Sequence, residues 1–229
     1  MEGVTSFGEK FYGRIKTRNL TNKQELLYKT LMPELEIESF TDINISNFAG
    51  IYLEIGFGGG EHVAQMAMNN HEDLFIGCEP FVNGIASLLV KIDANNIKNI
   101  RIYPGDARTF IRSIPDGVLS GVFLLFPDPW PKRKHIKRRF LQEKTITDIY
   151  NKLRIGGFWR LASDHNGYKE WILKLFNQEK FKKSFELKTF DKKNRPDVAV
   201  WAKTRYEQKA IEDILYVECI KSGSSNEVD

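Results

Sequence analysis

Short apolar runs alternate with segments whose apolar residues recur at helical spacing through the middle of the chain. The apolar runs predict successive strands at residues 51–55, 74–78, 100–103, 118–126 and 158–162. The helical spacing predicts helices among them at residues 61–68, 84–94, 138–153 and 168–177. Strands that alternate with helices are typical of an α/β fold, here a doubly wound, mostly parallel sheet with helices on both faces.

The two ends of the chain follow a different pattern. Residues 1–22 are polar and basic, and we expect them to form a flexible arm. A short helix at residues 23–31 is predicted to end before a proline. Strand-like stretches at residues 185–190 and 216–220 predict a C-terminal antiparallel edge, and the tail at residues 222–229 is expected to be disordered.

Composition and charge narrow the class of protein only a little. With 41% hydrophobic and 28% charged residues, the 229-residue chain has the balance of one soluble globular domain. A net charge of +4 is compatible with nucleic-acid binding without requiring it. Cys78 and Cys219 form no CxxC pair, so we expect no metal site and a reducing compartment. Neither a leader nor a membrane-spanning apolar stretch is evident, and we expect a cytoplasmic protein with no membrane partner.

A glycine-rich turn follows the first strand of the alternating region. Its sequence is Glu54-Ile55-Gly56-Phe57-Gly58-Gly59-Gly60, and it leads directly into a predicted helix. Glycines at such a turn allow a ligand to approach the backbone closely. The dinucleotide fingerprint needs a glycine where this chain has Glu61, and a carboxylate there would repel a pyrophosphate at the helix N-terminus. The turn therefore disfavours NAD or FAD and favours a nucleoside ligand without phosphates.

Acidic residues stand at or near the ends of three successive predicted strands. Glu79 has the spacing at which an acid accepts hydrogen bonds from ribose hydroxyls. Asp106 is a candidate acceptor for an adenine amino group, and Glu54 is a candidate partner for a ligand ammonium group. Each alone is more often a surface or capping carboxylate, but together they would line one crevice. The set resembles that of the class I S-adenosylmethionine-dependent methyltransferases, whose first motif is E-x-G-x-G-x-G.

The most distinctive segment of the chain follows the strand at residues 118–126. Residues 126–139 read Phe-Pro-Asp-Pro-Trp-Pro-Lys-Arg-Lys-His-Ile-Lys-Arg-Arg, and their three prolines restrict the backbone and remove amide donors. The cations precede the predicted helix at residues 138–153, where positive charge opposes the helix dipole. We therefore expect them to bind a polyanion, although a solvated basic turn is the simpler interpretation of a charge run alone.

This segment closely resembles that of the bacterial tRNA (guanine-N7)-methyltransferase family. Gly105-Asp106-Ala107, Ala162-Ser163-Asp164 and Thr204-Arg205-Tyr206-Glu207 match further motifs of the family. The resemblance implies a single Rossmann-like class I methyltransferase domain over residues 1–229. It also implies S-adenosyl-L-methionine as the methyl donor and tRNA as the partner, with guanine 46 of the variable loop as the target. A cytoplasmic monomer or homodimer is expected.

The functional residues of the family can be carried over to this chain by motif. The resemblance implies that the cofactor is bound by Glu54, Gly56, Gly58, Glu79, Asp106 and Asp128. It implies that Asp128 is also the catalytic residue. It implies that the substrate is bound by Lys132, Asp164, Thr204, Arg205, Tyr206 and Glu207. It implies that RNA is contacted by Lys134, His135, Ile136, Lys137, Arg138 and Arg139.

The chemistry of guanine N7 independently favours a carboxylate in this segment. N7 has a free lone pair and no proton, so it can attack a sulfonium methyl group without an obligatory base. The methylated base is cationic, and a nearby carboxylate stabilises the developing charge. Asp128 is the first candidate for this role and Asp164 the second. Trp130 suits stacking on an extruded base and packing in the core about equally. The remaining histidines are expected to be incidental: His62, His71 and His165.

Two other functions stay open. Asp128-Pro129-Trp130 resembles the D-P-P-Y/W motif of adenine-N6 methyltransferases, although the second proline is missing and a run of cations follows. A non-catalytic RNA-binding module with a methyltransferase fold is the other alternative, and the intact set of acids argues against it. Identification of the methylated nucleoside separates the first alternative from the family function, and a test of S-adenosylmethionine binding separates the second.

Overall fold

The computed structural model describes residues 3–4, 10–11, 18–191, 193–194, 202, 204–210 and 213–223. Most of the predicted basic arm at residues 1–22, and residues 224–229 of the predicted disordered tail, lie outside the described residues. The chain divides into two compact units. One consists of Met1–Ile114 with Asp197–Arg205, and the other of Pro115–Pro196 with Tyr206–Asp229. The single domain expected from the sequence stays a prediction.

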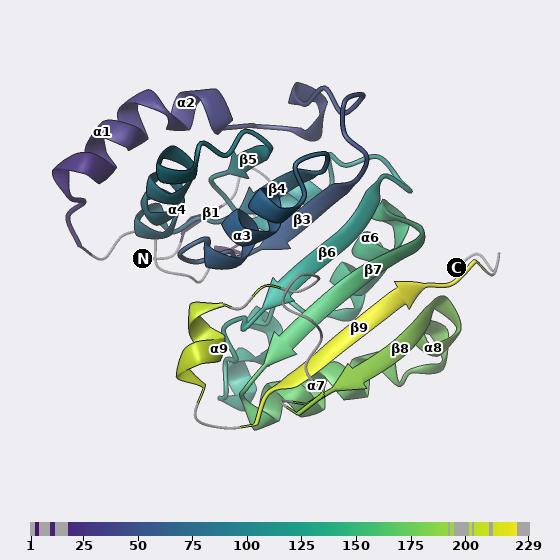
Figure 1. Cartoon of the computed structure of the whole chain (residues 1–229). Helices are drawn as coiled ribbons and strands as arrows, with labels where there is room; N and C mark the ends of the chain where they lie inside the picture. The colour runs from purple at the N-terminus through teal and green to yellow at the C-terminus, as the bar shows by residue number, and fades with distance from the viewer. Residues whose placement is uncertain are drawn as a thin grey trace. The chain divides into compact units, whose positions relative to one another are not determined.

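Three parallel strands form the sheet of the first unit (Figure 1). They are β3 (Ile51–Ile55), β4 (Leu74–Cys78) and β5 (Ile100–Tyr103), in the order β5-β4-β3. The last residues pair across the sheet, because Ile55 lies opposite Cys78 and Cys78 opposite Tyr103. The carboxyl ends of all three strands therefore meet at one edge, which is where α/β sheets bind their ligands.

Helices surround this sheet. Both α3 (Glu61–Asn69) and α4 (Val82–Asn95) carry a buried apolar stripe and pack against each other, and α3 also contacts β4. Helix α1 (Asn22–Thr30) packs on α4, and its N-terminus is closed by a capping box between Thr21 and Gln24. The remaining elements of this unit are β1 (Gly3–Val4), β2 (Lys10–Phe11), α2 (Met32–Leu35), η1 (Phe40–Asp42) and α5 (Ala107–Ile111).

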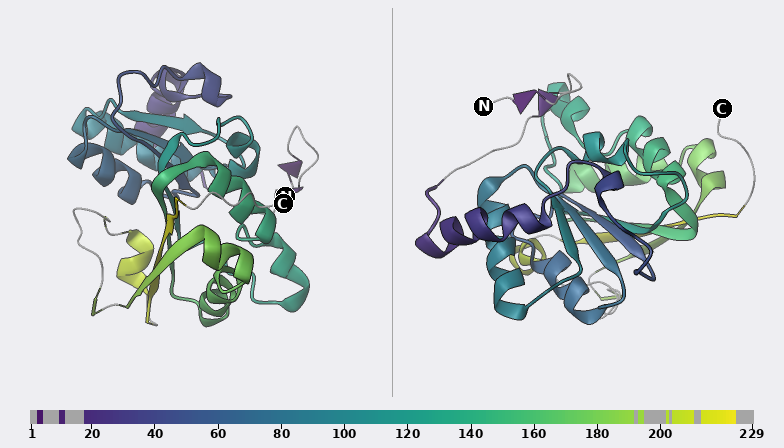
Figure 2. Two further views of the ribbon diagram at one scale, coloured as in Figure 1. Left: turned by 90° about the vertical axis from the view of Figure 1, so that its right-hand side faces the viewer. Right: turned by 90° about the horizontal axis from the view of Figure 1, so that it is seen from above.

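The second unit contains a mixed sheet with an antiparallel edge. Strands β6 (Leu119–Leu125) and β7 (Leu153–Ser163) are parallel, and β9 (Leu215–Lys221) and β8 (Phe185–Phe190) continue the sheet in antiparallel orientation. Helices α6 (Glu143–Lys152), α7 (Asn166–Phe176) and α8 (Glu179–Ser184) cover one face of this sheet (Figure 2). A 3₁₀ helix, η2 (Arg133–Arg138), and helix α9 (Arg205–Lys209) complete the described elements.

The predicted α/β fold with a C-terminal antiparallel edge is confirmed, but the helix predicted at residues 138–153 is wrong at its start. Helix α6 begins at Glu143, because the side chains of Gln142 and Thr145 form a capping box there. The cations of residues 133–138 form their own 3₁₀ helix, and the first turn of α6 carries an acidic residue. The predicted conflict between these cations and the dipole of a following helix therefore does not exist.

The strand that follows this helix also differs from the prediction. The predicted strand covers residues 158–162, but β7 already begins at Leu153, so Gly156 and Gly157 lie inside it. Leu119 pairs with Leu153 and Gly121 pairs with Phe158, so the residues between Leu153 and Phe158 are accommodated by a shift in register. Gly156 has φ of 74°, a conformation that glycine adopts without strain at such irregularities.

Candidate active site

The glycine turn of the first unit joins β3 to α3 through three residues with positive φ. These angles are 69° at Gly56, 55° at Gly58 and 75° at Gly60, so side chains other than hydrogen would strain the turn. The turn also lies close to α4, because a Cβ atom on Gly84 would clash with the carbonyl oxygen of Gly58. By contrast, no atom lies within 4 Å of a Cβ atom built on Gly56. The turn is therefore packed on one side and open at Gly56.

Glu79 holds this turn in place. It follows β4 and is only 8% exposed. Its carboxylate accepts a hydrogen bond from the backbone N–H of Gly58 at 2.8 Å and another from that of Phe81 at 3.0 Å. A carboxylate has about four acceptor sites, which is more than these two bonds occupy. Glu79 thus supports the turn and remains a suitable ribose acceptor.

Glu54 is paired with a histidine whose importance the sequence did not indicate. The carboxylate of Glu54, inside β3, is buried, and its Oε2 atom lies 2.7 Å from Nδ1 of His62. His62 is the second residue of α3 and is 2% exposed. The strand, the turn and the helix must fold back on one another to bring the two side chains together. His62 therefore has a structural contact that the sequence did not predict, and its expected lack of a catalytic role stays a prediction.

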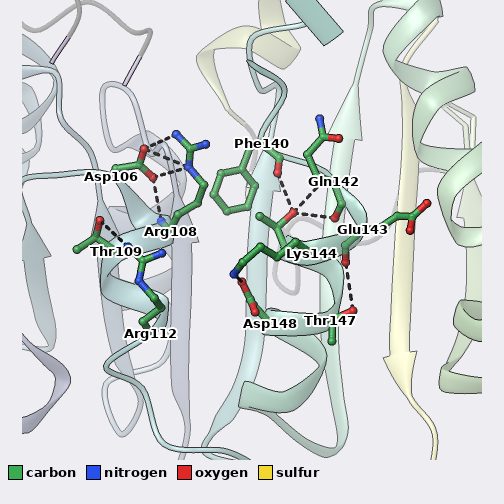
Figure 3. Close-up of polar contacts among 11 residues, drawn as sticks. Asp106, Arg108, Thr109, Arg112, Phe140, Gln142, Glu143, Lys144, Thr147 and Asp148 are labelled. Atoms are coloured by element: carbon green, nitrogen blue, oxygen red, sulfur yellow. Dashed lines mark hydrogen bonds and ion pairs between the residues drawn. The ribbon is translucent and has the colours of Figure 1, made fainter. Parts of the chain in front are cut away.

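Asp106 caps helix α5 at the end of the third strand. Its Oδ1 atom accepts a hydrogen bond from the backbone N–H of Arg108 at 2.9 Å. The guanidinium of Arg108 folds back on the same carboxylate, with Nη2 2.5 Å from Oδ2 (Figure 3). Burial raises the pKa of the neighbouring Cys78 thiol, and the negative charges of Asp106 and Glu79 raise it further. Both charges therefore act on the thiol of Cys78, the last residue of β4.

In the second unit, residues 126–131 form an irregular loop after β6. Phe126 and Trp130 have φ of 52° and 41°, which is rare for residues with a side chain and marks local strain of the kind found at functional sites. The N–H of Phe126 donates to the carbonyl of Ala162 at 2.8 Å, which ties the ends of β6 and β7 together. Asp128 is exposed between these two strained positions.

The cations after this loop do not have a common environment. Lys132, Lys134 and Lys137 are exposed, and Arg139 is 5% exposed. Burial lowers the pKa of the Arg139 guanidinium. Desolvation, and then the positive charges of nearby cations, lower the pKa of His135.

Trp130 is half-buried beside these cations and is not a core residue. The guanidinium carbon of Arg138 lies 5.1 Å from the centroid of the Trp130 ring, and the His135 ring meets it edge-on at 5.8 Å between centroids. One face of this indole is thus covered by the guanidinium of Arg138. This arrangement weakens the case for Trp130 as the residue that stacks on a base.

The other predicted substrate residues occupy varied positions. Asp164 follows β7 and is half-buried, and Thr204 is buried. Tyr206 is 58% exposed, and its ring lies parallel to that of Phe126 at 6.4 Å between centroids. Glu207 accepts a hydrogen bond from the hydroxyl of Tyr216 at 2.9 Å. Arg205 belongs to α9, but its side chain lies outside the described part of the structure.

In the described ranges of the chain, no group of three or more His, Cys, Asp or Glu side chains is placed to hold a metal ion. No helix in the same ranges has the length and apolar character needed to cross a membrane.

The fold is that of a class I methyltransferase. A solved structure of an antibiotic-related methyltransferase superposes with a TM-score of 0.54 at 13% identity, covering 89% of this chain and 96% of that one. A phosphoethanolamine N-methyltransferase of Haemonchus contortus, in complex with S-adenosylhomocysteine, superposes with a TM-score of 0.50 at 16% identity, covering 77% of this chain and 49% of that one. At these identities the likeness concerns the fold alone.

Sequence comparison identifies the family. A family model described as "Putative methyltransferase" matches residues 49–215. The tRNA (guanine-N7)-methyltransferase of Zymomonas mobilis is 41% identical over 207 residues, which are 89% of each chain. That of Caulobacter vibrioides is 38% identical over 206 residues, 88% of this chain and 89% of the relative. The chain therefore belongs to the bacterial tRNA (guanine-N7)-methyltransferase family.

Proposed function

We propose that this protein transfers the methyl group of S-adenosyl-L-methionine to N7 of guanine 46 in the variable loop of tRNA. The observation that carries the proposal is the exposed carboxylate of Asp128, in a strained loop at the carboxyl end of β6, in a chain of this family. A tRNA substrate implies a cytoplasmic location. We assign roles in cofactor binding, methyl transfer, base recognition and tRNA binding from the contacts and exposure of the described residues.

The glycine turn and its acids suit S-adenosylmethionine. The open space at Gly56 lets a ligand approach the backbone, and no phosphate has to be accommodated. Glu79 would accept hydrogen bonds from the ribose hydroxyls while its remaining lone pairs hold Gly58 and Phe81. Asp106 would accept from the adenine amino group, and Glu54 would face the ligand ammonium. When bound, the cofactor supplies an electrophilic methyl group on a sulfonium.

Asp128 has the position and the charge for the chemical step. Guanine N7 uses its own lone pair to form the new bond to carbon, so Asp128 need not remove a proton. Its carboxylate would accept hydrogen bonds from the guanine N1–H and amino group and would stabilise the positive charge that spreads over the purine. Asp164, at the end of the neighbouring strand β7, is the second candidate for this contact.

Tyr206 is better placed than Trp130 to receive the base. Its ring is more than half exposed and is backed by Phe126, two residues before Asp128. A base stacked on an aromatic ring gains about 1–3 kcal/mol without regard to its identity. Hydrogen bonds to polar neighbours would then select guanine. The residues proposed for this work are Asp128, Lys132, Asp164, Thr204, Arg205 and Glu207.

The exposed cations would hold the tRNA backbone. Lys134 and Lys137 point into solvent in the 3₁₀ helix that follows the loop of Asp128. Phosphate contacts from such side chains position RNA without reading its sequence. Their place next to the candidate catalytic residue would bring the variable loop to it.

Nucleoside analysis tests the proposal. Unmodified tRNA transcript is incubated with the protein and methyl-labelled S-adenosylmethionine, and the digested nucleosides are separated. We expect label in N7-methylguanosine, and its loss when guanine 46 is replaced by adenine in the transcript. Label in N6-methyladenosine would establish the adenine-N6 alternative. Absence of both transfer and cofactor binding by calorimetry would establish the non-catalytic RNA-binding alternative.

A further inference from the structure

Arg139 ends the basic run, but its surroundings are those of a structural residue. It is 5% exposed, unlike the lysines before it. Its Nε atom donates to the carbonyl of Pro129 at 2.8 Å, and its Nη1 atom donates to the carbonyl of Gly167 at 3.1 Å. The guanidinium carbon lies 5.3 Å from the ring centroid of Tyr168 and 5.4 Å from that of Trp171. A guanidinium packed in this way cannot also reach a phosphate.

The two carbonyls that Arg139 contacts belong to the segments that carry the candidate catalytic acids. Pro129 lies between Asp128 and the strained Trp130. Gly167 is the second residue of α7, which follows Asp164. The proline-rich loop has few amide donors of its own, so its conformation depends on donors from elsewhere that bind its carbonyls. Arg139 supplies such a donor from within the same loop region.

A buried guanidinium suits this task better than any other side chain. It presents five donors in a rigid plane and stacks on aromatic rings. Leaving it without partners in this position would be costly, so the bonds to both carbonyls are strongly favoured. A lysine at the same place would keep the charge but would offer a point donor in place of the planar fork.

We propose that Arg139 is a positioning residue that fixes the loop of Asp128 against the start of α7, and that it does not contact tRNA phosphates. The proposal rests on the proposed function, because its effect on turnover is exerted through Asp128. Arg139 would then differ in role from Lys134 and Lys137, although the family resemblance implies RNA contacts for all three.

The charge-preserving variant Arg139→Lys, compared with Lys137→Ala, tests this division of roles. We expect Arg139→Lys to lower kcat by about 100-fold, a loss that a misplacement of ~1 Å produces. The salt dependence of its tRNA binding should equal that of the wild type, because no phosphate contact is lost. Lys137→Ala should instead weaken tRNA binding and flatten its salt dependence. Wild-type turnover by Arg139→Lys, or a flatter salt dependence of its tRNA binding, would overturn the proposal.

Chemical rescue by free guanidinium tests whether the missing guanidinium group is the cause of the lost turnover. Arg139→Ala should regain turnover in guanidinium chloride at about 20 mM, far below the molar concentrations that unfold proteins. Sodium chloride at the same concentration should not restore it. Failure of guanidinium to restore a variant whose melting temperature matches the wild type would count against the clamp.

Amide hydrogen exchange gives a readout that needs no substrate. In Arg139→Lys, the amides of Phe126, Asp128 and Trp130 should exchange faster, and those of β3, β4 and β5 should not change. Unchanged exchange in the loop would refute the clamp. If the wild-type protein does not methylate tRNA, the proposed function fails, and the exchange measurement still decides whether Arg139 holds the loop.

Discussion

Two loops that follow parallel strands are held in opposite ways in this protein. The glycine turn after β3 presents amide donors, and a buried carboxylate, Glu79, accepts from the N–H of Gly58 in this turn and from the N–H of Phe81 in its own segment. The proline-rich loop after β6 presents carbonyls and few donors, and a buried cation, Arg139, donates to one of its carbonyls and to Gly167. A loop with unpaired N–H groups needs an acceptor, which a carboxylate supplies, and a loop with unpaired carbonyls needs a donor, which a guanidinium supplies. The buried side chain is therefore negative in the first loop and positive in the second.

The comparison shows that charge alone does not separate a residue that supports a site from one that acts in it. Glu79 and Arg139 are buried and bound to the backbone, whereas Asp128 and Lys137 are exposed. Burial with satisfied hydrogen bonds indicates support, and exposure at a strand end indicates contact with a ligand. Glu79 combines both properties, because a carboxylate has more acceptor sites than the turn uses.

The largest loss of turnover is expected from a substitution of Asp128. This exposed residue of the loop after β6 can be changed without disturbing Arg139, which holds the loop. Asp128→Asn should lower turnover by about 10²–10³-fold, the loss seen when one group that stabilises transition-state charge is removed. The melting temperature should not change, because the side chain is exposed. Asp164→Asn is the matched variant, with a smaller loss expected. Near-normal turnover by folded Asp128→Asn would remove Asp128 from the chemistry.

A smaller effect is expected when the support of the first loop is removed. Glu79→Ala should weaken S-adenosylmethionine binding by about 1–3 kcal/mol, because buried donors lose their acceptor. It should also lower the melting temperature. Glu61→Ala, at the start of α3 directly after the turn, removes a partly exposed ion pair with Lys91 at 3.4 Å. It should change the free energy of cofactor binding by about 0–1 kcal/mol and the melting temperature little. Equal effects of the two substitutions in calorimetry would mean that Glu79 has no special role.

The exposed cations of the second loop should affect tRNA binding and little else. In Lys134→Ala/Lys137→Ala, the slope of log Kd against log salt should fall by about 0.7–0.9 for each phosphate that the variant no longer neutralises. Affinity for S-adenosylmethionine should stay the same. Lys29→Ala/Lys98→Ala, which removes two exposed lysines of the first unit, serves as the control. If the slope does not change in Lys134→Ala/Lys137→Ala, these lysines do not bind phosphates and the segment is a solvated basic turn.

The smallest effect concerns His135 and pH. Its pKa is lowered below the ordinary value of about 6.5. As the pH falls through 6.5, the unfolded chain takes up the proton before the folded one, so the free energy of unfolding decreases slightly. At still lower pH the folded imidazole becomes cationic and tRNA binding should tighten. His135→Gln should abolish this tightening in binding measurements at several pH values, and His71→Gln should not.

Much of the fold could be predicted because buried strands have a strong local signature. The strands at residues 51–55, 74–78, 100–103 and 185–190 have the predicted bounds. Helix α5 was missed because it spans five residues, although its N-cap aspartate was a usable signal. The start of α6 was misplaced because apolar spacing continues across Gln142, whereas the capping box there decides where the helix begins.

The sequence by itself determined the chemical groups of this protein and the strands that carry them. The glycine turn, the acids at the strand ends and the loop of Asp128 all lie where their motifs predict. Only the tertiary structure decided which charged groups are buried and what they bind. His62 meets Glu54 because a helix folds back on its strand, and Arg139 meets Gly167 because two distant segments pack together. Whether a charged side chain is buried depends on residues far apart in the chain, so no local pattern assigns it.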